Sequence, residues 1–371
     1  MAHDKAMNIV NRLLLLHSGS ILKFVLHISS LYSENSTCSI DIDPWILFLS
    51  RNGIKELTLC NLGSISHKLP SSIFSCQGLT HLKLSMGEFA PTPVFKGFQN
   101  ITSLEFRKVT FPAANMVETI ISTSPLLERL KLDDCDGIDH LNIHTHNLKY
   151  LYVNVLESIC FKQSPNLTEI IIRSDLMLED SENSKMSNLI QLFDAAPKIE
   201  KLFLEVNSLK FLAAGGVPDR LSTPANQLKI LMLSPINFSD FDLLSLTLCL
   251  IRSSPNLQKL EIGASACKKA VADLAIIFLE SHWAEYSLEQ LRIVKINLIG
   301  KITGRSRPEL ELIKILLARS PSLETLFIDR ARMFNRRNVF LNDAKAELKM
   351  TRELAQFSSC INKSRNHFLE L

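Results

Sequence analysis

One pattern of apolar positions recurs along almost the whole chain: an apolar residue, two unrestricted residues, a second apolar residue, one unrestricted residue and a third apolar residue. The last three positions alternate, so each copy predicts a short β-strand with one buried and one open side. We find about twelve copies at a spacing of roughly 20 to 35 residues, which is typical of leucine-rich repeats. The copies are Ile21-Phe24-Leu26, Ile54-Leu57-Leu59, Leu79-Leu82-Leu84, Ile101-Leu104-Phe106, Leu127-Leu130-Leu132, Leu148-Leu151-Val153, Leu167-Ile170-Ile172, Ile199-Leu202-Leu204, Leu228-Leu231-Leu233, Leu257-Leu260-Ile262, Leu288-Leu291-Ile293 and Leu323-Leu326-Ile328.

Prolines separate several of these predicted strands from the segments before them. In five copies a proline stands two residues ahead of the first apolar position, at Pro125, Pro165, Pro197, Pro255 and Pro321. Proline cannot continue a helix and favours an extended residue before it, so these positions predict helix-to-strand turns.

Helix starts can also be read from the sequence. Asp43-Pro44 predicts an N-cap followed by proline in the first turn, with Gly53 ending that helix. The segment from Ser306 to Glu309 has the form of a capping box. Helices at residues 9–16 and near Leu341, Leu348 and Leu354 are expected to cap the two ends.

Together these elements predict the fold class: an α/β leucine-rich-repeat solenoid of about twelve repeats. We expect a horseshoe, with a parallel sheet on the concave side and helices on the convex side.

Composition narrows the function classes. The formal net charge is +3, and no clustered basic face is evident, so a nucleic-acid partner is not expected. No apolar stretch reaches the length of a membrane span, and no secretory leader is recognisable, so no membrane partner is expected either. None of the eight cysteines forms a C-x-x-C pair, which favours reduced thiols and a cytoplasmic or nuclear location.

Several longer motifs resemble the plant F-box/FBD/leucine-rich-repeat proteins. They are Asp43 to Leu57 (DPWILFLSRNGIKEL), Leu69 to Leu79, Ser124 to Leu130, Cys249 to Leu257, and the series Leu288, Leu291, Val294, Ile296, Pro308 to Leu310 and Ser320 to Glu324. The resemblance covers roughly residues 7 to 357. It implies a repeat solenoid over residues 1–286 and an FBD-like segment, with a C-terminal cap, over residues 287–371.

The resemblance also implies a partner. Members of that family normally begin with an F-box of about forty residues, which binds the adaptor subunit of a cullin-type ubiquitin ligase. Here the repeat array begins almost at Met1, so we expect no F-box and no direct binding of the adaptor. The end of the FBD usually carries a basic, alanine-rich helix and a final strand, and Gln356 to Leu371 departs from that pattern.

Three groups of residues could carry chemistry, and each also has a structural interpretation. His140, His144 and His146 lie near Asp133, Asp134 and Asp136 in the sequence, which would suit zinc or a polar strand and turn. The basic run of Arg330, Arg332, Arg336 and Arg337 suits an anion contact or a solvated loop. Gly300-Lys301 and Gly304 lack phosphate-loop spacing. We therefore expect no catalytic residue, metal or cofactor.

The predicted binding surface is the set of outward strand residues, which form one face in a stacked array. Its first part is polar and its later part mixes aromatic and apolar residues with charges, as recognition surfaces do. Coverage of the later part by loops or the C-terminal tail is the alternative. The candidates are Lys83, Glu105, Arg107, Arg129, Lys131, Tyr150, Tyr152, Ile171, Arg173, Phe203, Glu205, Ile230 and Met232, and Asp133 continues the polar part.

The sequence thus favours a protein-binding scaffold that is not an enzyme. It resembles the substrate-recognition part of an F-box receptor without the F-box, and its partner is an unknown protein. The alternative is an incomplete copy of a full cullin-type ubiquitin-ligase substrate receptor.

Overall fold

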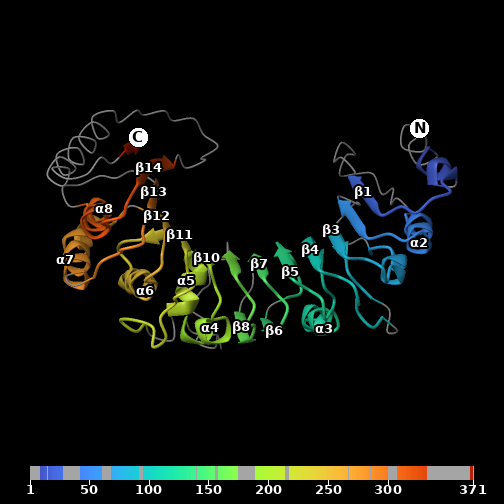
Figure 1. The fold of residues 1–371 in the computed structure, drawn as a ribbon, viewed down its shortest axis with the longest axis horizontal. Coiled ribbons are helices and arrows are strands. Elements are labelled where there is room, and N and C mark those ends of the chain that lie inside the picture. Colours follow the sequence, from blue (N-terminus) through green and yellow to red (C-terminus); the bar gives the residue numbers. More distant parts are fainter. Residues whose placement is uncertain are drawn as a thin grey trace. The chain divides into compact units, whose positions relative to one another are not determined.

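The computed structural model divides the chain into two compact units, Met1–Ser187 (unit 1) and Asn188–Leu371 (unit 2). In each unit the helices lie on one side of a parallel sheet (Figure 1). The structure describes residues 9–14, 16–27, 42–60, 68–91, 95–138, 140–154, 158–173, 189–213, 217–265, 267–283, 286–299, 307–331 and 368–370.

The sheet of unit 1 has the strand order β1-β2-β3-β4-β5-β7-β9, and every neighbouring pair is parallel. Its strands are β1 (Lys23–His27), β2 (Glu56–Cys60), β3 (His81–Glu88), β4 (Ser103–Thr110), β5 (Arg129–Asp133), β7 (Tyr150–Asn154) and β9 (Glu169–Arg173). Besides a helix at residues 9–14, its helices are α2 (Asp43–Arg51), the 3-10 helix η1 (Ser71–Ser75) and α3 (Met116–Ser122).

The sheet of unit 2 has the order β10-β11-β12-β13-β14-β15, again parallel throughout. Its strands are β10 (Lys201–Glu205), β11 (Ile230–Asn237), β12 (Lys259–Ser265), β13 (Ile293–Ile299), β14 (Thr325–Ala331) and β15 (Phe368–Glu370). Its helices are α4 (Leu189–Ala195), α5 (Val206–Ala213), α6 (Phe241–Arg252), η2 (Lys269–Val271), α7 (Ala272–His282) and α8 (Pro308–Arg319).

The apolar positions of the repeat build the core. Leu82, Leu104, Leu130, Leu151 and Ile170 are in register on consecutive strands and are all essentially unexposed. Burying a leucine or isoleucine side chain contributes about 1.5 to 3 kcal/mol, so each added strand extends a continuous stabilising column. The α/β leucine-rich-repeat class is confirmed. The horseshoe, its concave face and the number of repeats stay predictions.

Phenylalanines thicken the core of unit 1 beneath β3 and β4. Phe89 lies 5.1 Å from Phe74 and 5.2 Å from Phe106, measured between ring centroids, and both pairs are edge-to-face. Phe106 meets Phe111 in the same way at 5.3 Å. Such pairs add to the stability that area burial alone supplies.

The proline-marked turns have the predicted position and a common geometry. The carbonyl oxygens of Ser124, Ser164, Ser254 and Ser320 each accept the amide hydrogen of the residue three positions on, at 3.1 to 3.2 Å. Proline takes the second place of each turn, where its fixed φ suits a type I turn.

Asparagine side chains join consecutive repeats just before the strands. The amide nitrogens of Asn100, Asn147, Asn166 and Asn256 donate to backbone carbonyls of the preceding repeat at 2.6 to 3.0 Å. Each of these asparagines directly precedes the first apolar residue of a repeat. They satisfy carbonyl groups that the strand ladder leaves free.

One predicted strand motif was out of register. The motif Leu288-Leu291-Ile293 places Ile293 in the core, but Ile293 is half-buried and pairs with Lys259 on the open face. The core column instead continues through Val294 and Ile296, which pair with Leu260 and Ile262. Leu288 belongs to the preceding turn, where its carbonyl accepts the Leu291 amide at 3.2 Å. The spacing of leucines alone misled here, because a leucine also fills that turn.

A second sheet was not predicted from the sequence. It pairs β6 (His140–His144) with β8 (Ser158–Gln163) in parallel, beside α3. These strands occupy the connections between β5, β7 and β9. Strand β15 likewise matches no predicted motif.

The helix caps differ in detail from the prediction. Ile42 and not Asp43 is the N-cap of α2, and Arg307 is the N-cap of α8. Gly53 follows α2 with a φ of 78°, as expected of a glycine beyond a helix end. Residues 9–14 form the expected N-terminal helix, and Trp45 on α2 donates its indole N–H to Asn11. The predicted C-terminal helix and Ser306 lie outside the described residues.

Candidate functional site

The open side of each sheet carries the predicted binding residues, and in unit 1 they form three rows that cross the strands. We call these rows the unit 1 face. One row runs Lys83, Glu105, Lys131, Tyr152 and Ile171. A second contains Arg129, Tyr150 and Glu169, and a third contains Arg107, Asp133, Asn154 and Arg173. All nine candidates in unit 1 are therefore brought onto one surface.

Asp133 is the central acceptor of the unit 1 face. The Tyr152 hydroxyl donates to its Oδ1 at 3.2 Å and the Asn154 amide at 3.3 Å. Arg107 and Lys131 each approach its Oδ2 to 3.8 Å. One carboxylate thus serves four neighbours from three strands.

The two tyrosines are partly covered by cations of the neighbouring strand. The guanidinium of Arg129 lies 3.9 Å above the centre of the Tyr150 ring, and the Lys131 ammonium lies 4.6 Å from that of Tyr152. Burial raises the pKa of the Tyr152 hydroxyl, so it stays protonated and can donate to Asp133 while accepting from Arg173 at 3.5 Å. The aromatic rings are half-buried and supported, not free-standing.

The remaining candidates, Phe203, Glu205, Ile230 and Met232, lie on β10 and β11 of unit 2. Phe203 and Met232 are direct register partners, and Ile230 stands two residues before Met232 on the same side. All four side chains are half-buried. Together they form the start of the open side of this sheet, which we call the unit 2 face, and Phe203, Ile230 and Met232 make it mainly apolar.

The open side of unit 2 continues beyond β11, although no candidates were predicted there from the sequence. Glu261 is the register partner of Met232 and forms ion pairs with Lys295 at 3.2 Å and with Lys259 at 3.7 Å. Its carboxylate also accepts a hydrogen bond from the Asn297 amide at 3.1 Å. These residues hold the same repeat positions as the candidates, so the motif could have found Glu261 and Lys259. Ile293, Lys295 and Asn297 were hidden by the register error on β13.

The structure does not bring the histidines and Asp133 together as a metal site would require. Asp133 faces the open side of the main sheet, whereas His140 and His144 lie on β6 of the second sheet. The His144 and His146 rings meet edge-to-face at 5.8 Å. Within the described ranges, no group of three or more histidine, cysteine, aspartate or glutamate residues could hold a metal ion. Of the basic run, Arg330 lies on β14 and the other three arginines lie outside the described residues.

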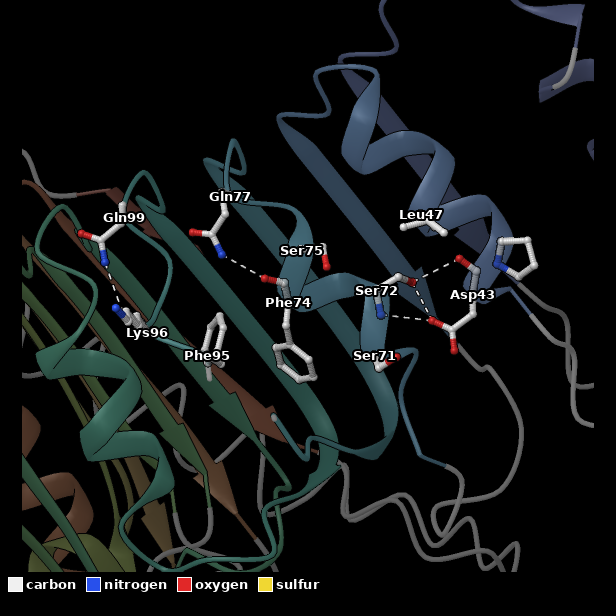
Figure 2. Close-up of a pocket in the computed structure, with 11 residues that line it drawn as sticks. Asp43, Leu47, Ser71, Ser72, Phe74, Ser75, Gln77, Phe95, Lys96 and Gln99 are labelled. Carbon is white, nitrogen blue, oxygen red and sulfur yellow. Dashed lines mark hydrogen bonds between the residues drawn. The ribbon is translucent and has the colours of Figure 1, made fainter. Parts of the chain in front are cut away.

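A groove of about 910 Å³ opens on the helix side of unit 1 (Figure 2). It lies between α2, η1 and residues 95–99, and its polar groups are largely engaged within the protein. The Asp43 carboxylate accepts from the Ser72 hydroxyl at 2.6 Å and amide at 3.1 Å. Gln77 and Gln99 donate to backbone carbonyls.

Two buried cysteines of unit 1 have thiols that are hard to deprotonate. Burial raises the pKa of Cys76 and of Cys135 to about 12, so both remain thiols at neutral pH. Each lies in the core of unit 1.

No helix in the described part of the chain is long and apolar enough to cross a membrane.

The fold and its repeated open-face rows define a leucine-rich-repeat protein, and sequence comparison identifies the family. Residues 42–262 match the family model described as "FBD-associated F-box protein At5g56370, LRR repeats". F-box/FBD/LRR-repeat protein At1g13570 of Arabidopsis thaliana is 34% identical over 97% of this chain and 83% of its own length. The chain therefore belongs to the plant F-box/FBD/LRR-repeat family.

Two further Arabidopsis thaliana relatives match shorter parts. The probable FBD-associated F-box protein At1g32375 is 22% identical over 68% of this chain and 63% of its own length. The putative FBD-associated F-box protein At5g53635 is 28% identical over 40% of this chain. The chain spans 36% of the latter relative's length, so the match concerns only part of that protein.

Proposed function

We propose that this chain is the partner-recognition part of a ubiquitin-ligase receptor of the F-box type and that it binds a protein on the open faces of its sheets. The observation that carries the proposal is the set of in-register rows of half-buried aromatic side chains and of charged side chains, held by one another on consecutive strands. Pre-ordered side chains lose little entropy on binding, which favours recognition. The role requires binding only, and we propose no catalysis.

We also propose that residues 287–371 are an FBD-like segment that continues the repeats begun in residues 1–286. Strands β13 and β14 support this, because β13 pairs in parallel with β12 and β14 pairs in parallel with β13, both without a break in register.

The face assignment can be tested by affinity purification from plant extract with the full chain as bait. The test variant Tyr152→Ala/Phe203→Ala removes one aromatic from each open face. The matched control Leu126→Ala/Leu274→Ala removes one exposed leucine from each unit, from a turn and from α7. We expect mass spectrometry to show at least a tenfold loss of the main partner, about 1.4 kcal/mol, for the test variant alone.

Thermal unfolding of the variants must accompany the purification, because Tyr152 also bonds Asp133. Equal partner recovery by the wild type and a folded test variant would refute the proposed faces. Equal loss from the control would do the same.

A further inference from the structure

Cations form the outermost layer of the unit 1 face. In the pair of Lys83 and Glu105, joined at 3.0 Å, the side chains are 51% and 33% exposed. In the pair of Arg107 and Asp133 they are 65% and 18% exposed. An approaching molecule therefore meets ammonium and guanidinium groups first, with the carboxylates recessed between them.

The charges of the unit 1 face do not balance. Its described part from β3 to β9 carries more cations than carboxylates. Asp133 divides its single charge between Arg107 and Lys131, and its remaining contacts are to the neutral Tyr152 and Asn154. The cations are Lys83, Arg107, Arg129, Lys131 and Arg173, and the carboxylates are Glu105, Asp133 and Glu169.

Arg129 is prepared for a carboxylate. Its guanidinium rests on the Tyr150 ring, and it makes no ion pair with any residue that the structure describes. Stacking immobilises a guanidinium while leaving its in-plane N–H groups available for two parallel hydrogen bonds. An incoming aspartate or glutamate would gain these bonds without first ordering the arginine.

We infer, resting on the proposed function, that the unit 1 face binds an acidic segment of its protein partner, with spaced aspartate or glutamate side chains on Arg129, Arg107 and Lys83. Neighbouring strands are about 4.8 Å apart, so cations on successive strands match carboxylates that are separated along a peptide. The recessed carboxylates of Glu105 and Asp133 disfavour a nucleic acid. A nucleic acid carries a negative charge at every nucleotide, so some of its phosphates would lie close to these carboxylates and be repelled.

The probe for this inference is a fluorescein-labelled peptide of alternating glutamate and alanine, titrated with the full chain and followed by fluorescence anisotropy. A peptide with glutamine in place of glutamate and a single-stranded RNA of equal charge are the comparison ligands. We expect the acidic peptide to bind most tightly. The affinity for the acidic peptide should fall when the NaCl concentration is raised from about 0.1 M to about 1 M, because the Debye length then shortens from about 10 Å to about 3 Å.

Two charge-matched variants locate the binding. Arg107→Gln/Arg129→Gln removes two cations of the unit 1 face, both exposed. Lys149→Gln/Lys162→Gln removes two exposed lysines, one before β7 and one on β8 of the second sheet. We expect at least tenfold weaker peptide binding for the first variant and less than a twofold change for the second.

The outcomes separate this inference from the proposed function. Equal binding of the glutamate and glutamine peptides, or equal loss in both variants, overturns the acidic partner. RNA binding as tight as the acidic peptide, with the same sensitivity to Arg107→Gln/Arg129→Gln, overturns the choice of a protein segment. If the peptide assay fails while Tyr152→Ala/Phe203→Ala still loses its partner from extract, the proposed function stands. If that variant also keeps its partner, the proposed function fails as well.

Discussion

At the scale of single residues, Glu309 couples ionisation to folding. It is 3% exposed in the first turn of α8, and its Oε1 accepts the Cys267 amide at 3.1 Å. Burial raises the pKa of this carboxyl above its ordinary 4.5, although hydrogen bonds from the backbone amides of Glu309 and Cys267 oppose the rise. A carboxyl with a raised pKa in the folded state stabilises the fold fully below its unfolded pKa. That contribution is lost as pH rises through the folded pKa.

We therefore expect Glu309→Gln to flatten the dependence of stability on pH from pH 4.5 upward. Glutamine keeps an oxygen for the Cys267 amide but cannot ionise. Urea unfolding across this range, relative to wild type, measures the slope. Glu324→Gln removes an exposed carboxylate paired with Arg292 at 3.8 Å and should keep the wild-type slope. An unchanged slope in Glu309→Gln would show that Glu309 is not the titrating group.

At the scale of elements, two glycines with the same φ of 78° meet different surroundings. Gly53 follows α2, and an added Cβ would meet only Ser20, at 3.9 Å. Gly137 lies in the turn after β5, where an added Cβ would collide with the carbonyl oxygen of Phe111. The first position requires only the left-handed backbone, and the second also requires the close approach of Phe111, the residue directly after β4.

Alanine substitutions at these glycines should separate the two requirements. Gly53→Ala should cost about 1 kcal/mol of unfolding free energy, the price of a left-handed alanine. Gly137→Ala should cost about 1 to 3 kcal/mol more, because a backbone carbonyl must move. Chemical denaturation of both variants measures the difference. Equal costs would contradict the close approach between Gly137 and Phe111.

At the same scale, some features of the fold could be predicted from the sequence and others could not. The strand motifs and the proline-marked turns were predicted because both are local patterns of a few residues. The asparagine bonds at Asn100, Asn147, Asn166 and Asn256 were not, although their position beside the motif repeats. Their acceptors lie one repeat earlier, and only the stacking of repeats brings donor and acceptor together.

At the scale of the whole molecule, stability is expected to be distributed along the repeats. A repeat contacts mainly its neighbours, so damage in one place spreads over a short distance. Leu104 on β4 is fully buried between Leu82 and Leu130 of the adjoining strands. It is a suitable place to test this locality.

Leu104→Ala should cost about 2 to 5 kcal/mol, through lost burial and the cavity left behind. Hydrogen exchange followed by mass spectrometry should show the largest acceleration in β3, β4 and β5, and a smaller one in β12 and β13. Leu126→Ala removes a leucine that is already 48% exposed and should leave exchange unchanged. Uniform acceleration over both units would contradict local coupling.

The sequence by itself determined the repeat, the buried side of the predicted strands other than β13, and the open side on which the candidate positions of β3 to β11 lie, because alternating burial is a local consequence of strand geometry. Only the tertiary structure decided the register at Ile293, the sheet of β6 and β8, and the cover of cations over Asp133 and the tyrosines. Those features join residues about one repeat apart. Their contacts depend on how neighbouring repeats are offset, which no local pattern encodes.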